Sequence, residues 1–333
     1  MIARRRVVVA LAAAGASHLA WAQNPSKIPK LGFLSSSTRL FGQWDRSPFR
    51  IKLSELGWTE GKNIVIERVY AEGNEARLPA LAADLVRKGV DVIYAFGPIA
   101  AIDAARATKT IPIVFFGVAW PVEQGLADGF ARPGRNVTGV AWSASTEIYA
   151  KQLQFVRDII PDATRLAHFL IPNAVRKLDG GNFDGLDKTI ESAAHSLGFK
   201  LDIYNVYKPA DFEAAFKSIQ ASRVHALVTP ATPLTVLERQ RIVDFTARSR
   251  LPSFFDMEFF VEAGGLFHYG PDLLEMTRRA ASYVDRILRG ATPRDLPIEQ
   301  PTKFDLVINL KTAKALGIKI PQTVLLQATR LID

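Results

Sequence analysis

Residues 90–118 read VDVIYAFGPIAAIDAARATKTIPIVFFGV, which is one complete strand–helix–strand pattern. Residues 90–96 and 111–116 are apolar runs of strand length, and Gly97-Pro98 is a turn that opens a helix of small residues. Strands that are apolar throughout are buried on both faces, which is typical of parallel sheets covered by helices. The stretch therefore predicts an α/β fold.

The same alternation continues on both sides of this stretch. Upstream, strands are expected at 30–34 and 64–69, with a helix between them that has one apolar face. Downstream, the rhythm restarts after residue 140, with helices expected at 146–159, 186–197, 211–221 and 234–248 and strands at 166–171, 200–206, 226–229 and 253–255. Two successive sets of such units predict two Rossmann-like lobes with parallel sheets rather than one long sheet.

The C-terminal part departs from this rhythm. It contains, in order, a strand at 264–270, a helix at 271–288, a proline-rich stretch, a strand at 304–308 and a short helix at 312–316. We expect these elements to complete both lobes, so the chain must cross between the lobes again. The predicted division is residues 29–140 plus 266–292 for lobe 1 and residues 141–265 plus 293–333 for lobe 2.

The first 22 residues have the three parts of a cleavable export signal. Arg4-Arg5-Arg6 is the basic start, residues 7–19 are the apolar run, and Ala20-Trp21-Ala22 is the small-residue cleavage site. The apolar run is too short to span a bilayer as a helix. The pattern predicts a soluble protein of the periplasm, cut after Ala22, with the general secretory and twin-arginine export routes both open.

Composition excludes several classes of function. The 333 residues suffice for two domains, and the absence of cysteine excludes disulfides, thiolate metal sites, a catalytic cysteine and a lipid anchor on such a residue. The net charge of +9 falls to +6 without the signal, and the remaining basic residues are dispersed among carboxylates. We therefore expect a mildly basic, solvated surface and no nucleic-acid partner.

Ligands of open parallel sheets bind beyond the carboxyl ends of the strands. The candidate ligand-binding residues at those ends, and at the expected crossing between the lobes, are Ser35, Ser36, Thr38, Phe96, Gly97, Pro98, Ala119, Trp120, Trp142, Asn173, Thr229, Thr232 and Asp256. Hydroxyls, an amide, a carboxylate and aromatic rings make a hydrogen-bonding and stacking set, not a nucleophile with its base.

Two features of this set have alternative interpretations. Helices that begin after residues 35–38 and at Gly97-Pro98 would direct free N–H groups at a carboxylate, although serine and threonine also occur there as plain helix caps. Trp120 and Trp142 would either stack on a planar or apolar ligand or pack between the lobes.

The sequence lacks the common motifs of catalysis and of nucleotide binding. It has no H-E-x-x-H zinc helix, no G-x-S-x-G elbow, no G-x-x-x-x-G-K-[ST] loop, and no G-x-G-x-x-G after the first strand. Four residues match part of a calcium loop: Asn182, Asp184, Gly185 and Glu191. The first position of that loop would be Gly180, which has no carboxylate. We therefore expect no enzyme activity, no cofactor and no metal ion.

A series of short stretches resembles the family of ABC-transporter substrate-binding proteins that includes tryptophan- and tyrosine-binding members. The stretches are LGWTEGKNI (56–64), RLPALA (77–82), IPIVF (111–115), GL (125–126), ARPGRNVTG (131–139), EAGGL (262–266), YGP (269–271) and INLKTAKALG (308–317). Together they extend over nearly all of residues 30–330, and their combination is specific although no single stretch is.

The resemblance implies a type I periplasmic-binding fold, in which two Rossmann-like lobes are joined by a three-segment hinge. It also implies a monomer that closes on a small organic solute in the cleft and presents it to an ABC permease in the inner membrane. Members are often linked to aromatic amino acids or related solutes. The first-turn hydroxyls of the family correspond to Ser35, Ser36 and Thr38, and its Gly-x-Pro turn corresponds to Gly97-Pro98.

One position departs from the family pattern. Many relatives carry Asp-Pro-Val where this chain has Trp120-Pro121-Val122. A carboxylate at that place could pair with the α-ammonium of an amino acid, and an indole ring cannot. The departure favours an aromatic or apolar carboxylate over an amino acid as the ligand.

Other functional classes fit the sequence less well. A periplasmic ligand sensor for a signalling receptor would have the same residues, and only neighbouring permease and ATPase genes would separate the two. An exported two-lobed transferase would need a phosphate site and an acid/base pair, which the sequence does not contain. A DNA-binding regulator of similar fold would begin with a helix-turn-helix, and here a signal stands in that place.

Overall fold

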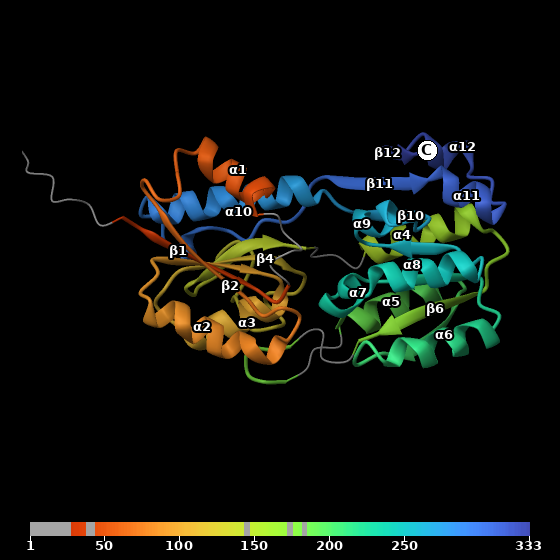
Figure 1. Ribbon diagram of the computed structural model, residues 1–333, viewed down its shortest axis with the longest axis horizontal. Helices are drawn as coiled ribbons and strands as arrows, with labels where there is room; N and C mark the ends of the chain where they lie inside the picture. Colours follow the sequence, from red (N-terminus) through yellow and green to blue (C-terminus); the bar gives the residue numbers. More distant parts are fainter. Residues whose placement is uncertain (1–27, 38–43, 143–146, 172–175, 182–184) are drawn as a thin grey trace, which may run out of the picture.

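The computed structural model describes residues 28–37, 44–142, 147–171, 176–181 and 185–333. Two α/β lobes lie side by side, each built on its own sheet (Figure 1). The predicted α/β class with two mainly parallel sheets is therefore confirmed. The residues of the expected export signal lie outside the described part of the chain.

The first lobe contains a five-stranded parallel sheet in the order β2-β1-β3-β4-β5. Its strands are β1 (Lys30–Ser35), β2 (Val65–Tyr70), β3 (Val92–Phe96), β4 (Ile113–Val118) and β5 (Val137–Ala141). Helices α2 (Leu78–Arg87) and α3 (Pro98–Ala107) cover one face, and α1 (Pro48–Glu55) and α10 (Leu273–Leu288) cover the other (Figure 1). Short 3₁₀ turns lie at Trp44–Arg46 (η1), Glu75–Arg77 (η2) and Pro293–Asp295 (η3).

Side-chain alternation along β3 explains why helices are needed on both faces. Ile93 and Ala95 pack in the cluster that faces α2 and α3, whereas Val92 and Tyr94 pack in the cluster that faces α1 and α10. Successive strand residues point to opposite faces, so a strand that is apolar throughout must be covered twice.

The second lobe contains a seven-stranded sheet in the order β12-β11-β10-β9-β8-β6-β7. Its strands are β6 (Arg165–Leu170), β7 (Lys200–Asn205), β8 (Ala226–Thr229), β9 (Ser253–Phe255), β10 (Phe267–Pro271), β11 (Phe304–Asn309) and β12 (Arg330–Ile332). Its helices are α4 (Glu147–Ile159), α5 (Gly185–Ser196), α6 (Asp211–Ala221), α7 (Pro233–Leu237), α8 (Arg239–Arg248), α9 (Glu258–Glu262), α11 (Leu310–Leu316) and α12 (Gln322–Leu325). The β10–β11 pair is antiparallel, and the other neighbouring pairs are parallel.

Two C-terminal segments lie in the other lobe from the one predicted. The expected division put residues 266–292 in lobe 1, but β10 pairs with β9 and β11 inside the second sheet, so this strand was misplaced. Residues 293–299 were expected in lobe 2, but Leu296 and Ile298 are buried in the core of the first lobe. Both placements depend on strand pairing and burial over long distances, which local periodicity does not contain. The domain limits as a whole remain a prediction.

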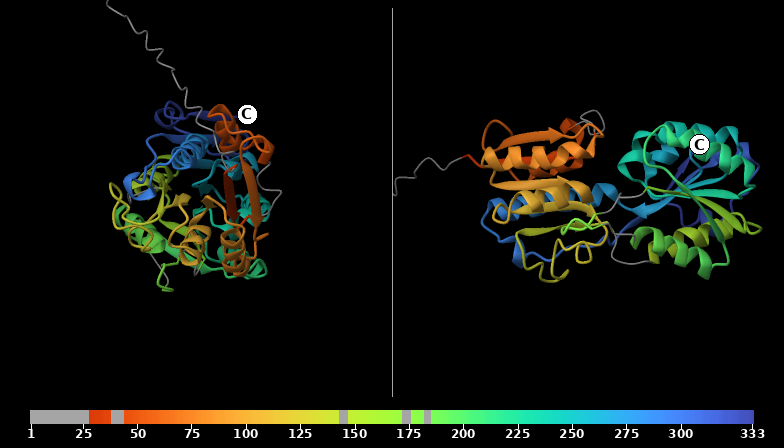
Figure 2. Two further views of the ribbon diagram at one scale, coloured as in Figure 1. Left: turned by 90° about the vertical axis from the view of Figure 1, so that its left-hand side faces the viewer. Right: turned by 90° about the horizontal axis from the view of Figure 1, so that it is seen from below.

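In chain order, the elements of the two lobes alternate at three points. One change of lobe falls between β5 and α4, a second between β10 and α10, and a third between Glu299 and β11. The last two can be followed in Figures 1 and 2. The last two are tied together, because the Asp272 backbone N–H donates to the Lys303 carbonyl at 3.0 Å. Three connections of this kind are the covalent arrangement of a hinge.

Over the described ranges, no helix has both the length and the apolar composition needed to cross a bilayer.

Candidate binding site between the lobes

A cavity of about 250 Å³ lies between the two lobes, with walls from both. Aromatic rings dominate the first-lobe wall, where Phe96 and Phe116 stack with ring centroids 4.8 Å apart. Trp120 and Trp142 line the same cavity, as does Tyr149 from the first turn of α4 in the second lobe. Such a cavity offers area for a planar, apolar ligand body.

The turn between β3 and α3 forms the polar part of this wall. Gly97 has φ 98° and ψ 161°, a backbone region that is essentially reserved for glycine. This conformation ends β3 abruptly and starts α3 at Pro98, so that the first turn of the helix lies against the cavity. The N–H groups of Ile99 and Ala100 have no acceptor within the helix, because an α-helix leaves its first N–H groups unpaired. A carboxylate is the natural partner for such a terminus.

Serines at the end of β1 divide into two roles. Ser36 lines the cavity, together with its neighbour Ser37. Ser35 does not, because its hydroxyl accepts a hydrogen bond from the Ser37 backbone N–H at 3.1 Å and holds the turn. The turn hydroxyls thus include both a plain structural cap and residues available to a ligand.

Trp120 and Trp142 each take part in packing as well as in the cavity wall. Trp120 packs against a second-lobe cluster of Ile148, Tyr149 and Ile190, so it joins the two lobes. Trp142 is buried in the first-lobe cluster that faces α1 and α10. Packing between lobes and contact with a ligand are therefore compatible interpretations for Trp120.

Asp256 brings a carboxylate into the second-lobe wall, directly after β9. Its Oδ1 accepts a hydrogen bond from the Ala231 backbone N–H at 2.7 Å. Burial in this poorly solvated place raises the pKa of Asp256 from its ordinary 3.8 to about 7, because desolvation disfavours the charged form. The carboxyl group can therefore be either neutral or charged near neutral pH.

Arg239 brings a positive charge into the same wall. It begins α8, and its Nη1 donates to the Val236 carbonyl at 3.3 Å. Among the described residues that line the cavity, Asp256 and Arg239 are the charged ones. Thr232 lies beside them and caps α7 through a reciprocal hydrogen-bond pair with Thr235.

The structure brings most of the predicted residues together. Those that line the cavity are Ser36, Phe96, Gly97, Pro98, Ala119, Trp120, Trp142, Thr232 and Asp256. Ser35 and Thr229 do not line it, since Ser35 holds its turn and Thr229 is buried at the end of β8 with 1% of its surface exposed. Thr38 and Asn173 lie outside the described residues.

Sequence reasoning missed several lining residues that lie on helices or on longer loops. They include Gln124, Tyr149, Leu237 and Arg239. A search beyond the strand ends, through the first turn of each following helix, would have found Tyr149. Arg239 begins a second helix after the strand end, and no local signal marks it.

The calcium-like pattern lies only partly within the described residues. Asn182 and Asp184 lie outside it, whereas Gly185 and Glu191 belong to α5. Within the described ranges, no three histidine, aspartate or glutamate side chains gather in a group that could hold a metal ion.

Two hinged α/β lobes around a cavity of hydrogen-bonding and aromatic residues define a two-lobed solute-binding protein. The family described as "ABC transporter substrate binding protein" matches residues 46–332, so the chain belongs to this family. Its members are substrate-binding proteins and not enzymes, which confirms the expectation that this chain is not an enzyme. The resemblance noted from the short sequence stretches is confirmed as well.

Individual relatives agree with this assignment. A tyrosine-binding protein of Clostridioides difficile is 25% identical over 267 residues, which cover 80% of this chain and 74% of the relative. The crystal structure of a conserved domain protein from Vibrio cholerae superposes with a TM-score of 0.83 at 26% identity, over 92% of this chain and all of that one. A Streptococcus pneumoniae ABC domain in complex with L-Trp has a TM-score of 0.82 at 22% identity, over 91% of this chain and 99% of that one. These structures share the type I periplasmic-binding fold.

Proposed function

We propose that this protein captures a small organic solute with an aromatic or apolar body in the cleft between its lobes and delivers it to an ABC permease. The observation that carries the proposal is the aromatic-lined cavity whose walls come from both lobes. A solute held there touches both lobes at once, so its binding free energy favours the closed arrangement. The carrier would be a monomer.

The walls favour a ligand with a carboxylate. The start of α3 supplies backbone N–H groups, and Arg239 supplies a guanidinium on the opposite lobe. The rings of Phe96, Phe116 and Trp120 suit a flat apolar body between these two ends. An aromatic carboxylate and an aromatic amino acid both satisfy this description.

The choice between these two ligand classes depends on Trp120 and Asp256. Trp120 stands where many relatives have aspartate, which removes one partner for an ammonium group. Asp256 lines the same cavity and could serve as such a partner when it is charged. We propose the aromatic carboxylate as the ligand, because the carboxyl group of Asp256 is half neutral at a pH of about 7.

Calorimetric titration with L-tryptophan, L-tyrosine, phenylacetate and indole-3-acetate tests this choice. Phenylacetate or indole-3-acetate should bind more tightly than either amino acid. Tight binding of tryptophan or tyrosine would overturn the choice of ligand class. Failure of all four, together with native mass spectrometry that detects no bound solute in gently purified protein, would count against capture itself.

The pH dependence of the same titration separates the two classes independently. An ammonium group gains a charged partner as Asp256 ionises, so an amino acid should bind more tightly at pH 8 than at pH 5.5. A simple carboxylate is repelled by the ionised group and should bind more tightly at pH 5.5. Equal slopes for both ligands would show that Asp256 does not contact either of them.

The place of action is proposed from the export signal. We propose that residues 1–22 direct the chain to the periplasm and are removed there. N-terminal sequencing of protein from the periplasmic fraction should begin at Gln23.

A further inference from the structure

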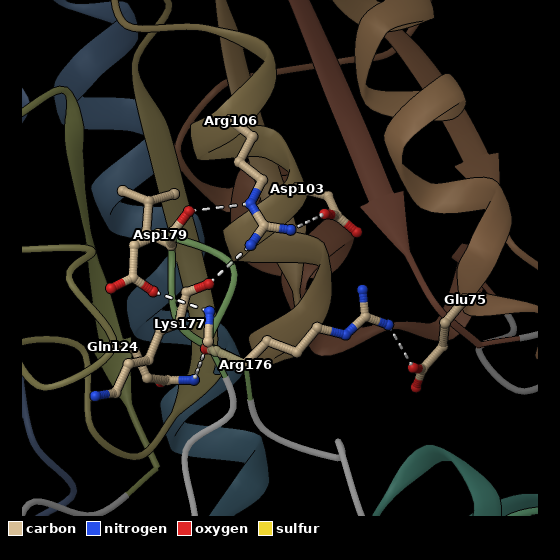
Figure 3. A network of polar contacts seen from close by, with 9 residues as sticks. Glu75, Asp103, Arg106, Gln124, Arg176, Lys177 and Asp179 are labelled. Atoms are coloured by element: carbon tan, nitrogen blue, oxygen red, sulfur yellow. Dashed lines mark hydrogen bonds and ion pairs between the residues drawn. The ribbon is translucent and has the colours of Figure 1, made fainter.

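A short segment of the second lobe lies against the first lobe, beside the cavity. Residues 176–181 lie in the chain between β6 and α5, both of which belong to the second lobe. We name this segment the strap. Figure 3 shows it between α3, the turn that carries Gln124, and η2, all of which belong to the first lobe. A glycine at φ 103°, Gly180, shapes its tight turn, which the Lys177 N–H closes by donating to the Gly181 carbonyl at 2.7 Å.

Arg106 of α3 holds the backbone of the strap. Its Nε donates to the Leu178 carbonyl at 3.1 Å, and its Nη2 donates to the Lys177 carbonyl at 2.8 Å (Figure 3). Its Nη1 lies 3.4 Å from Asp103, which is 1% exposed. The buried carboxylate of Asp103 thus orients the guanidinium of Arg106, which donates to two backbone carbonyls of the strap.

Further contacts fix the strap on either side of Arg106. Arg176 pairs with Glu75 of η2 at 3.1 Å, and the side chain of Leu178 packs against the first-lobe core. Gln124 makes two hydrogen bonds to the strap. Its side-chain Nε2 donates to the Arg176 carbonyl at 3.0 Å, and its backbone carbonyl accepts from the Leu178 N–H at 2.8 Å.

Gln124 connects the strap to the solute site. It is 1% exposed, lines the cavity and belongs to the loop that begins at Trp120. That loop is closed by the Gln124 N–H, which donates to the Trp120 carbonyl at 2.9 Å. Docking of the strap therefore constrains the same loop that carries the indole ring in the cavity wall.

We propose that Arg106, which does not line the cavity, is a positioning residue for solute binding, because it docks the strap and thereby holds the two lobes in the closed arrangement. The expected effect of Arg106 on solute affinity rests on the proposed function. The affinity of a binding protein falls in proportion to the fraction of molecules in the binding-competent state. Loss of the strap contacts should therefore raise the apparent dissociation constant without altering any group that touches the solute.

The absence of cysteine from the chain permits a direct measurement of lobe separation. Ala83 on α2 and Ala214 on α6 are exposed and lie on different lobes, so cysteines there can carry a pair of spin labels. Electron–electron distance measurements on the full chain, with no solute added, then report opening by themselves.

Arg106→Gln is the main variant, because glutamine retains a donor for Asp103 but cannot reach both strap carbonyls. Arg87→Gln is the matched control: Arg87 also follows an aspartate by three residues, in α2 of the same lobe, and pairs with it at 2.7 Å. Arg176→Gln is a second variant. It removes the partly exposed ion pair with Glu75 and leaves the pair between Arg106 and Asp103 in place.

We expect Arg106→Gln to lengthen and broaden the label distances, and Arg176→Gln to do so less, while Arg87→Gln matches the unmodified chain. With the tightest of the four titrated solutes, Arg106→Gln should bind about tenfold more weakly, mainly through faster dissociation. Unchanged distances and dissociation rates in both strap variants, with urea unfolding as in the control, would overturn the proposal. If the unmodified chain binds none of the four solutes, the proposed ligand fails, and the label distances alone decide the role of the strap.

Discussion

At the residue scale, Asp256 is a carboxyl group in an unusual environment. Its carboxyl is 5% exposed and accepts from the Ala231 N–H, at 2.7 Å, and from its own backbone N–H. Desolvation by burial outweighs these two donors, so the carboxyl keeps its proton to higher pH than it does in water. Perturbed pKa values cluster at functional sites, so the raised pKa makes Asp256 a candidate contact for the ligand.

Replacement of Asp256 by asparagine should change how stability depends on pH. Burial raises the pKa from 3.8 to about 7, so between these values the unfolded chain has lost a proton that the folded chain keeps. The unmodified protein therefore loses stability from about pH 4 to pH 7, by roughly 4 kcal/mol for this group. Asp256→Asn should lack this loss, as urea unfolding at pH 4.5, 6 and 8 would measure. If the unfolding free energies of the two proteins changed equally with pH, this result would contradict the raised pKa of Asp256.

Trp120 carries the second prediction at this scale. Trp120→Asp replaces the indole ring with a carboxylate in the cavity wall. The variant should bind L-tryptophan or L-tyrosine more tightly than the unmodified chain and phenylacetate more weakly, by about tenfold each way, since one charged contact is worth about 1.4 kcal/mol or more. Trp120→Phe is the matched control, because it keeps a ring and adds no charge. A loss of binding to all solutes in both variants would indicate that the indole acts only in packing.

At the element scale, the β3–α3 unit forms both a structural corner and part of the cavity wall. Residues 92–95 of β3 are buried, and α3 is lined by small side chains that allow it to lie close to the sheet. The turn between them must reverse direction within one residue. Gly97 accomplishes this with a conformation that a side chain would strain, and it starts the helix against the cavity.

Gly97→Ala should therefore destabilise both the corner and the site. The backbone region at φ 98° and ψ 161° costs a residue with a side chain about 1–3 kcal/mol. Urea unfolding should show this loss, and the affinity for the tightest solute should fall because the start of α3 moves. Gly129→Ala is the control: Gly129 has no positive φ, and the nearest atom to an added Cβ is 3.8 Å away. An unfolding free energy for Gly97→Ala equal to that of the control would contradict the assigned strain.

At the scale of the whole molecule, each lobe has its own core. Two apolar clusters sandwich the first sheet and two sandwich the second, while the cavity lies between the lobes. Lobes with separate cores can move as rigid bodies about the three connections. Solute binding and lobe closure are then two aspects of one equilibrium.

Saturation with the bound solute should make the molecule smaller and more stable. Small-angle X-ray scattering should show a reduced radius of gyration, and the free energy of unfolding should rise by about 2.7 kcal/mol at a solute concentration one hundred times the dissociation constant. Arg106→Gln should show a larger change in radius than the unmodified chain, because it begins more open. Stabilisation without any change in radius would mean that the solute binds to lobes that are already closed.

Local sequence determined the class of the fold and many of the residues that line the cavity. Apolar strand runs such as residues 92–96 and helix stripes are periodic over a few residues, and the ends of the strands follow from them. Because ligands bind at those ends, residues such as Gly97, Trp120 and Asp256 could be identified before any contact was known. The structure places these residues in one cavity.

Tertiary structure alone decided the rest. The sheet that β10 joins, the lobe that buries Ile298, the presence of Arg239 in the cavity and the docking of the strap on Arg106 depend on contacts between residues far apart in the chain. Such contacts form where two surfaces together bury apolar area and pair their polar groups. The local sequence of either surface does not indicate which surface it will contact. Periodicity specifies the elements, whereas packing between them specifies which lobe each one completes.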